Sequence, residues 1–271
     1  MSYGIAARPR FQEPATTAPV VFLSAVRSAY VGPSLRLAPH RNAVACVVLS
    51  LGEPFTLAAG GSPREARSAL IPPNTLHQLT AGSGAIAFLY LDPLDVAVAG
   101  GPGWRQRTRS GVSLEHAGAE EAVAALLRLR AVKPAAAGRQ VLDTLGGLVE
   151  PSGTRTDRRI TSALRKLEPV VEGLDAAECR LDRVAAGLEL SVSRAQHLIR
   201  EVTGVPFRRY RTWVRMRVAA RTLASGGTLT EAAHVAGFSS AAHFSTAFRT
   251  MFGLPPSALV SAGTCFVVLP A

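Results

Sequence analysis

The second half of the chain contains an internal repeat, and this repeat limits the possible folds more than any other feature. An offset of 49 residues superposes Ser191 on Ser240, and residues 204–206 (Gly-Val-Pro) on residues 253–255 (Gly-Leu-Pro). In each copy a serine can cap a helix by accepting hydrogen bonds from its first amides, and the Gly-x-Pro sequence ends that helix. A short helical segment precedes each serine. Each copy is therefore typical of a helix-turn-helix unit.

Apolar periodicity between these signals predicts the helices of this half. The first unit pairs 181–187 with 192–202, the second pairs 229–236 with 241–252, and one long helix over 207–223 joins them. Aromatic side chains at buried spacing are assigned to the core, namely Tyr210, Trp213, Phe238, Phe244 and Phe248. Arginines between them are expected to stay free in solvent, namely Arg208, Arg209, Arg211 and Arg215.

The first half has a different pattern. Between Val20 and Val98, short apolar runs such as VVFLSAV and AIAFLYL are separated by turns rich in Gly and Pro. Such runs are typical of the short strands of a small β-sandwich or barrel. Residues 119–131 and 138–149 then repeat apolar side chains at helical spacing. We expect an α+β protein of two domains, a cupin-like β-barrel with amphipathic helices followed by an all-α domain.

The domain boundaries follow these changes of pattern. Residues 1–18 are polar and unpatterned, and we predict a flexible tail there. The sequence EPSGTRT at 150–156 interrupts the helical pattern, and we predict a linker. The β-rich domain with its two helices then spans 19–149, and the all-α domain spans 157–262. Residues 263–271 are an apolar tail with no assigned role.

The charge balance favours a polyanionic partner. The chain carries 30 Lys and Arg against 19 Asp and Glu, for a formal net charge of +11. Between Arg200 and Arg221 there are seven arginines and one acidic residue, Glu201. Nucleic acid is the first candidate for such a surface. A solvated helix face, or the Arg-rich usage of a GC-rich genome, is the alternative explanation of the same arginines.

The cysteines and the hydropathy argue against several other classes. Cys46, Cys179 and Cys265 are odd in number, far apart and without metal-ligand spacing, so neither a disulfide framework nor a zinc finger is indicated. No apolar run approaches the ~20 residues of a membrane helix, and the first residues lack the apolar core of a secretory signal. We expect a cytoplasmic protein without a membrane partner.

Two segments of the second half resemble a known family. The segments LSVSRAQHLIREVTGVPFRRYRTWVRMRVAARTLA and LTEAAHVAGFSSAAHFSTAFRTMFGLPP are similar to the double helix-turn-helix DNA-binding domain of the AraC/XylS family of transcriptional regulators. The most specific part is GF-x-S-x-x-x-F-x-x-x-F-R-x-x-x-G-x-x-P at 237–256. The resemblance implies that helices 192–202 and 241–252 enter successive major-groove segments on one face of DNA. It leaves activation and repression as alternatives.

The resemblance also assigns DNA-contacting residues. Base-facing positions are Ser193, Gln196 and His197 on the first reading helix, and Ala241, Ala242, His243 and Thr246 on the second. Phosphate contacts are assigned to Arg194, Arg200, Arg208, Arg209, Ser239, Ser240 and Arg249. Gln196 is the strongest candidate for base readout, because an amide can bond an adenine edge bidentately. The two alanines lack donors and acceptors, so the second helix is expected to bind mostly through phosphates.

The first half resembles the cupin-like sensor barrel that precedes this DNA-binding domain in many family members. The similar segments are PHRNAVACVVLSLGEPF and ARSALIPPNTLHQL. A barrel of this type offers a concave apolar interior for a small-molecule effector. Polar or soft side chains beside the apolar runs are the pocket candidates, namely Tyr30, Arg36, His40, Cys46 and His77. A metal-dependent cupin needs several histidines and a carboxylate, so we expect no metal, no cofactor and no enzymatic activity.

The expected partners are double-stranded promoter or operator DNA, a small-molecule effector, a second copy of the chain and RNA polymerase. The apolar faces of the helices at 119–131 and 138–149 must be covered by the barrel, by each other or by that second copy. Two alternatives stay open. In the first, the β-rich half is a metal-dependent cupin enzyme or a small-molecule binding protein, and the basic half is an interaction module. In the second, the chain is an architectural DNA binder without sequence preference.

Overall fold

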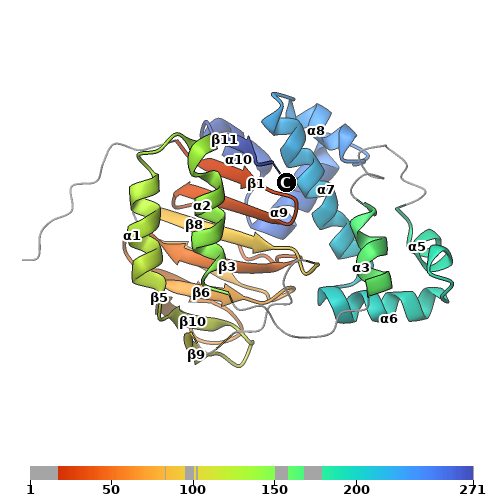
Figure 1. The fold of residues 1–271 in the computed structure, drawn as a ribbon, viewed down its shortest axis with the longest axis horizontal. Coiled ribbons are helices and arrows are strands. Elements are labelled where there is room, and N and C mark those ends of the chain that lie inside the picture. Colours follow the sequence, from red (N-terminus) through yellow and green to blue (C-terminus); the bar gives the residue numbers. More distant parts are fainter. Residues whose placement is uncertain are drawn as a thin grey trace, which may run out of the picture.

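A large β-sheet and a group of helices lie side by side in the computed structural model, which describes residues 18–82, 84–94, 101, 103–149, 158–167 and 179–270 (Figure 1). Most of the tail predicted at 1–18 and the whole linker predicted at 150–156 lie outside the described residues. The β-rich first half and helical second half are those expected of a two-domain α+β protein. Below, the strands of the sheets with helices α1 and α2 are called the sensor region, and the helices from Arg158 onward the reading region.

The sensor region is built on an eight-stranded sheet with the order β11-β1-β2-β8-β3-β6-β10-β9. Neighbouring strands pair antiparallel except β1 and β11, which run parallel. The strands are β1 (Val20–Leu23), β2 (Arg27–Pro33), β3 (Ala45–Ser50), β6 (Ser68–Ile71), β8 (Ala85–Leu91), β9 (Trp104–Arg107), β10 (Ser113–His116) and β11 (Cys265–Val268). A second sheet has the order β5-β4-β7, with β4 (Phe55–Ala58), β5 (Arg64–Ala66) and β7 (Gln78–Ala81).

The central strand β3 shows why this sheet forms. All six of its residues are buried, and successive side chains point to opposite faces. Val47 and Leu49 belong to the core under two helices, whereas Cys46 and Val48 belong to the core that faces the second sheet. A strand buried on both faces is a continuous apolar run and does not alternate. The two sheets do not close into one hydrogen-bonded ring in the described residues, so the barrel is open.

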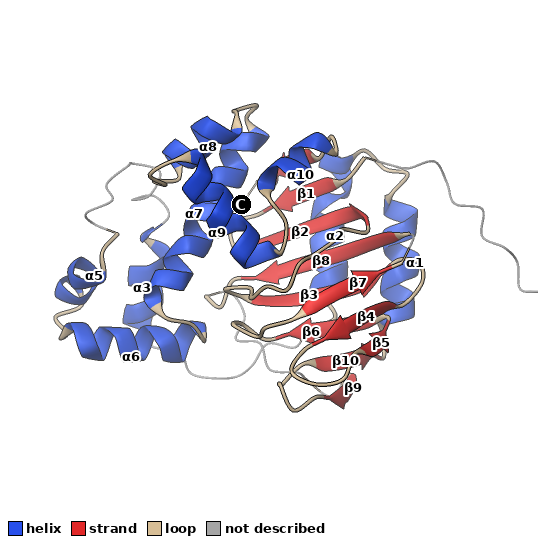
Figure 2. Ribbon diagram, turned by 180° about the vertical axis from the view of Figure 1, so that it is seen from behind, coloured by secondary structure: helices blue, strands red, loops and turns tan. Residues whose placement is uncertain are grey.

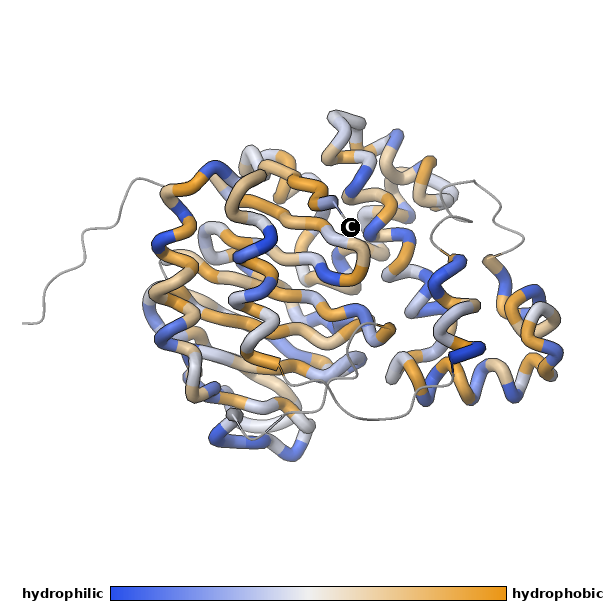
Figure 3. The backbone as a smooth tube through the Cα atoms, in the orientation of Figure 1, coloured by the Kyte–Doolittle hydropathy of each residue, from blue (hydrophilic) through white to orange (hydrophobic). Residues whose placement is uncertain are grey.

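Helices α1 (Ala119–Leu129) and α2 (Pro134–Gly146) cover one face of the large sheet (Figure 1). Their apolar sides, with Leu126 and Leu145 fully buried, pack on strands β1, β2, β3 and β8. Burial of such a leucine contributes about 1.5–3 kcal/mol. The sequence predicted that these apolar faces are covered by the barrel, by each other or by a second copy of the chain. In the structure the sheet covers them. Figure 3 shows hydrophobic strands and helices that alternate between hydrophobic and hydrophilic residues.

The reading region consists of short helices around one long helix. They are α3 (Arg158–Arg165), α5 (Leu181–Gly187), α6 (Val192–Thr203), α7 (Phe207–Ala224), α8 (Leu229–Val235), α9 (Ala241–Phe252) and α10 (Pro256–Ser261). The two helix-turn-helix pairs, α5 with α6 and α8 with α9, lie within one or two residues of the bounds predicted from the sequence. Gly204 and Gly253 end α6 and α9 in the left-handed conformation, with φ of 74° and 80°, which glycine adopts without steric cost.

The last strand ties the end of the chain to its beginning. Strand β11 pairs with β1 in parallel register, with Val20 opposite Cys265 and Leu23 opposite Val268. The hydrogen bond from Leu269 N to Leu23 O, at 2.8 Å, continues this pairing. The segment predicted to be an apolar tail, 263–271, thus contributes strand β11 to the sensor sheet. Along the chain, the reading region therefore lies between two parts of that sheet. Figure 2 shows the strands and the helices of the reading region side by side from the opposite direction.

Candidate nucleic-acid interface and interdomain cavity

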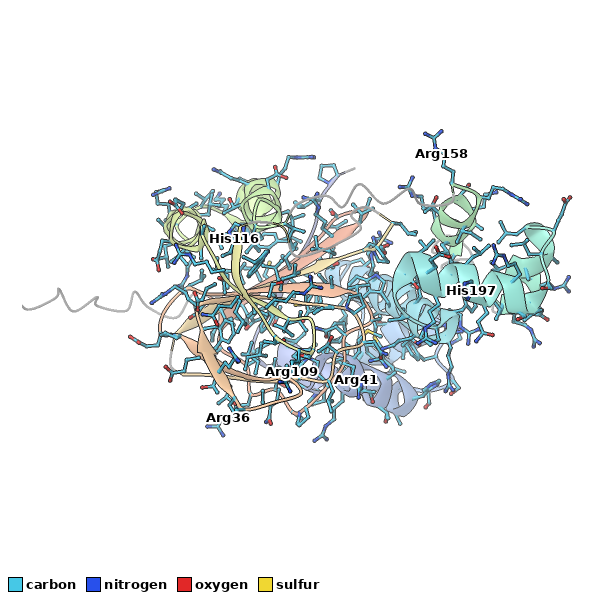
Figure 4. All side chains as sticks on the ribbon, turned by 90° about the horizontal axis from the view of Figure 1, so that it is seen from below. Arg36, Arg41, Arg109, His116, Arg158 and His197 are labelled. Carbon is cyan, nitrogen blue, oxygen red and sulfur yellow. The ribbon has the colours of Figure 1, made fainter. Side chains whose placement is uncertain are left out.

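Helix α6 has one buried and one polar exposed face. The side chain of Ser191 caps the helix by accepting a hydrogen bond from Arg194 N at 3.2 Å. Ala195 and Ile199 are fully buried. The residues that the sequence assigned to DNA lie on the other side and are all exposed, namely Ser193, Arg194, Gln196, His197 and Arg200. Figure 4 shows His197 on this helix.

Helix α9 repeats this arrangement. Ser240 caps it by accepting from His243 N at 3.1 Å, and Phe244 and Met251 are buried. The exposed face carries Ala242, His243, Thr246 and Arg249, while Ala241 is half-buried. The ring of His243 lies 3.0 Å from Ser239 Oγ through Nδ1 and packs edge-on against Phe238. This histidine is therefore held in one orientation at the start of the helix.

The arginines of the joining helix α7 are less free than predicted, and this expectation is corrected. Arg208 is exposed, but three others are half-buried. Arg209 donates to the carbonyl of Arg41, Arg211 Nη1 donates to Cys179 O at 2.9 Å, and Arg215 lies over the ring of Phe238. The helix packs against the sensor region and against α8, so most of its circumference contacts other elements. The aromatic residues assigned to the core are buried as predicted, with Phe248 half-buried.

A buried polar cluster joins α7 to the sensor region. The carboxylate of Asp92, at the end of β8, accepts from Tyr210 Oη at 3.2 Å and from Trp213 Nε1 at 3.1 Å. Arg217 Nη1 lies 3.4 Å from Asp92 Oδ2, and both side chains are almost fully buried. Arg217 also donates to Ser24 O at 3.0 Å. Burial, followed by the charge of Asp92, raises the pKa of Tyr210, which therefore stays a neutral donor.

An apolar cavity of about 90 Å³ lies beside this cluster, between the large sheet and the reading region. Strands β1, β2, β8 and β11 of the sheet form one wall, and α7, α9 and α10 form the other. Phe88, Tyr90 and Trp213 line it together with Phe252 of the reading helix. Tyr90 and Phe252 contact each other edge to face with centroids 5.4 Å apart. Arg217 is the cation among the described lining residues.

The predicted effector residues lie in four different places. Tyr30 lines the cavity, and its hydroxyl donates to Pro33 O at 2.8 Å. Cys46 is buried opposite Tyr90 in the sheet and does not line the cavity; burial raises the pKa of its thiol. Arg36 is exposed and projects from the sensor region (Figure 4). His40 and His77 lie elsewhere, at the contact between the two regions.

His40 and His77 form a two-residue β-bridge at that contact. Their backbones exchange hydrogen bonds of 2.9 and 3.0 Å, and their ring centroids are 4.2 Å apart. Each Nδ1 donates to a backbone carbonyl two residues earlier. Burial lowers the pKa of His77 to about 4, and burial also lowers the pKa of His40. Among the described residues no group of three or more His, Cys, Asp or Glu could hold a metal ion.

Sequence reasoning missed Asp92 and Arg217. Asp92 is a single acidic residue between an apolar strand and Pro93, and Arg217 is one of the seven arginines between Arg200 and Arg221. The signal that could have identified Asp92 is its position directly after a buried strand, because a charge placed there needs a partner. The partner is 125 residues away in the sequence and could not be assigned from local pattern.

Helices α6 and α9 are each the second helix of a helix-turn-helix pair. Each is capped by a serine and exposes a polar face, and this arrangement is that of a DNA-binding protein of the double helix-turn-helix class. The comparison with protein families agrees: residues 184–262 match the model of a helix-turn-helix domain, of the AraC type. Residues 184–262 thus form a helix-turn-helix domain of the kind found in AraC-type DNA-binding transcriptional regulators. The search of curated protein sequences gave no match.

The whole fold is similar to that of ToxT from Vibrio cholerae. An apo form of a ToxT variant has a TM-score of 0.57 and 13% identity, covering 88% of this chain and 97% of that chain. ToxT bound to (E)-4-(8-methylnaphthalen-1-yl)but-3-enoic acid has a TM-score of 0.54 and 13% identity, covering 88% and 99%. Fatty-acid-bound wild-type ToxT has a TM-score of 0.50 and 12% identity, covering 91% and 96%. At these identities the likeness establishes the fold alone. No described helix is long and apolar enough to span a membrane.

Proposed function

We propose that this regulator reads DNA bases with α6 and α9 and responds to a small amphipathic acid bound between its two regions. The reading role is carried by one observation. Both helices start at a capping serine, bury the same side and expose the positions assigned to base contacts, apart from the half-buried Ala241. Gln196 on α6 provides direct readout, and α9 contributes phosphate contacts through Ser239, Ser240 and Arg249 with weaker base selectivity.

A footprint on the bound DNA tests this arrangement of reading helices. Two helices that enter successive major-groove segments protect two patches about 10 base pairs apart on one face of the duplex. Substitution of Gln196 by alanine is expected to change the preferred sequence in one patch alone. A single patch, or a footprint spread evenly along the fragment, would contradict the proposal.

The effector site is proposed to be the interdomain cavity instead of the interior of the sheet. The cavity has apolar walls and one cationic side chain, Arg217, which already pairs with Asp92. An acid bound there competes with Asp92 for Arg217 and so acts on α7, the helix that joins the reading units. The two ToxT structures with bound acids support this class of ligand. About 90 Å³ holds more than one water but lies below the ~300 Å³ of sites for drug-sized ligands, which favours a small acid.

Fluorescence of Trp213 gives a direct assay, because its indole lines the cavity. We expect hexanoate to change this fluorescence saturably, and hexanol to have a much weaker effect because it lacks the carboxylate. Exchange of Trp104 for phenylalanine removes the other tryptophan, which lies outside the cavity lining. Equal responses to acid and alcohol would contradict the role of Arg217, and no response to any short acid would contradict the site.

The remaining partners follow from the same proposal. We propose a homodimer, which would give two double readers and a longer recognition site, with RNA polymerase as the further partner at a promoter. The target DNA implies action in the cytoplasm. We also keep the division proposed from the sequence, with a sensor domain at 19–149 and a DNA-binding domain at 157–262. Light scattering of the purified chain with and without its DNA site tests the dimer.

A further inference from the structure

A basic groove lies along the second half of reading helix α9, where the sensor region meets it. The groove measures about 500 Å³ and is lined by three arginines from two regions of the chain: Arg41, Arg209 and Arg249. No acidic side chain is among the described residues that line it. Thr246 of the proposed reading face lines the same groove, so the groove continues that face. Like charges gathered without a carboxylate favour an anionic partner.

Main-chain hydrogen bonds hold Arg41 beside α9. In the loop between β2 and β3, Ala38 N donates to Gly253 O at 2.8 Å and Arg41 N donates to Thr250 O at 3.4 Å. Arg209 also donates to the carbonyl of Arg41. Figure 4 shows Arg41 beside the helices of the reading region, whereas Arg36, five residues earlier, points away from them. The position of Arg41 relative to α9 is thus fixed by backbone on both sides.

The side chain of Arg41 is oriented but exposed. Its Nη1 donates to Asn74 O at 2.7 Å. A guanidinium has five N–H donors, so a single orienting bond leaves donors for a charge-assisted bond to a phosphate oxygen. The surroundings are already positive. Burial, followed by the charge of Arg41, lowers the pKa of Arg209, and the charge of Arg209 contributes to the lowered pKa of His40.

We propose that Arg41 of the sensor region binds a backbone phosphate of the DNA that α9 reads. The inference rests on the proposed reading role of α9. A DNA duplex is the anion that fits best. The protein groove opens onto Thr246 and Arg249, which lie on the face of α9 proposed to approach the DNA. That face enters the major groove of the duplex, and backbone phosphates line both edges of the major groove. The sensor region then contributes to DNA binding directly. A ligand that shifts the two regions relative to each other would therefore change the position of this phosphate contact as well as the position of α9.

Salt-dependent DNA titration of the full chain tests the inference. Arg41→Ala is expected to weaken binding to all sequences alike and to make the slope of log K against log salt shallower by about 0.9, the value for one phosphate. The advantage of the unaltered protein then shrinks about 3.5-fold between 50 and 200 mM salt. Arg41→Lys keeps the charge and is expected to retain most of the slope.

Arg128→Ala is the matched control. Arg128 is an exposed arginine of the same region, but it lies on α1, which covers the opposite face of the sheet from α9. Its removal lowers the net charge equally and is expected to leave the slope unchanged. Equal slopes for Arg41→Ala and Arg128→Ala would overturn the inference while the unaltered protein still selects its motif. Absence of any motif for the unaltered protein would instead count against the proposed function. Thermal unfolding of each variant establishes that it is folded.

Discussion

Arg217 of α7 is buried against Asp92 of the sensor region at 3.4 Å, and this ion pair is the polar centre of the contact between the two regions. Tyr210 and Trp213, on the same helix, donate to the same carboxylate. The two reading units are joined by α7, so a contact that fixes α7 also fixes their orientation relative to the sensor. Under the proposed function, a ligand bound in the cavity acts through this cluster.

Removal of the charge of Asp92 is expected to destabilise the protein strongly. Asp92→Asn keeps the size of the side chain but leaves the guanidinium of Arg217 buried without its counter-charge. Breaking one partner of a buried pair costs about 3–5 kcal/mol. Denaturant unfolding measures this loss, and Asp143→Asn, an exposed acid on α2, is the control. A loss below about 1 kcal/mol for Asp92→Asn would contradict this role of the ion pair.

Gly253 is expected to tolerate no side chain. Its φ is 80°, and a Cβ there would lie 2.6 Å from Ala38 O and 2.7 Å from Nδ1 of His40. Gly226 has a φ of 88° and open space around the same position. Substitution by alanine should therefore cost about 1–2 kcal/mol at Gly226, from backbone strain alone, and about 2–5 kcal/mol at Gly253. Equal losses in an unfolding titration would show that the loop and α9 are not in tight contact.

Acid is expected to weaken the contact at His40 and His77. An unfolded histidine has a pKa near 6.5, whereas burial holds that of His77 at about 4. Between these values the unfolded chain binds more protons, so stability falls as pH decreases through this window. The loss at pH 5 relative to neutral pH is about 2 kcal/mol for this residue. Arg209 beside His40 opposes protonation further.

A variant isolates this contribution from other titrating groups. His77→Asn cannot titrate, so its unfolding free energy should change less between pH 7 and pH 5 than that of the unaltered protein. His234→Asn, on the exposed side of α8, should behave like the unaltered protein. Parallel pH dependence of all three proteins would disprove the assignment.

Two substitutions on α6 separate base readout from phosphate binding. Gln196→Ala should relax base preference at one position, at a cost of about 1–3 kcal/mol on the preferred sequence. Arg200→Ala should weaken binding to every sequence alike and reduce the salt slope by about one. Competition titrations against a panel of single-base variants measure both effects. Identical profiles for the two variants would place α6 in a different register on the DNA.

Local signals predicted the reading region well. Capping serines, Gly stops and apolar periodicity are encoded within one or two turns of chain, and the bounds of α6, α7 and α9 followed from them. The strands were recognised as short apolar runs, but their order could not be predicted, because each pairing depends on residues far apart. Strand β11 is the clearest case, since its partner β1 lies at the other end of the chain.

The candidate site could be predicted only in part, because local patterns do not show how distant segments of the chain pack together. Exposure of Gln196 and His197 follows from helical periodicity alone. The bridge between His40 and His77, and the pairing of Arg217 with Asp92, arise only when distant segments pack. Periodicity also treats a helix as having one buried face, and α7 has several. The half-buried arginines of α7 were therefore expected in solvent.

Selection of genomic fragments by the purified full chain at about 150 mM salt, followed by competition against random DNA, tests the central claim most directly, because affinities without stated salt and competitor are uninterpretable. The account predicts a motif in two parts about one helical turn apart, bound at least ~10³-fold more tightly than random DNA. Uniform binding with a steep salt slope and no motif would contradict it, and would identify the arginines as a non-specific polyanion-binding surface.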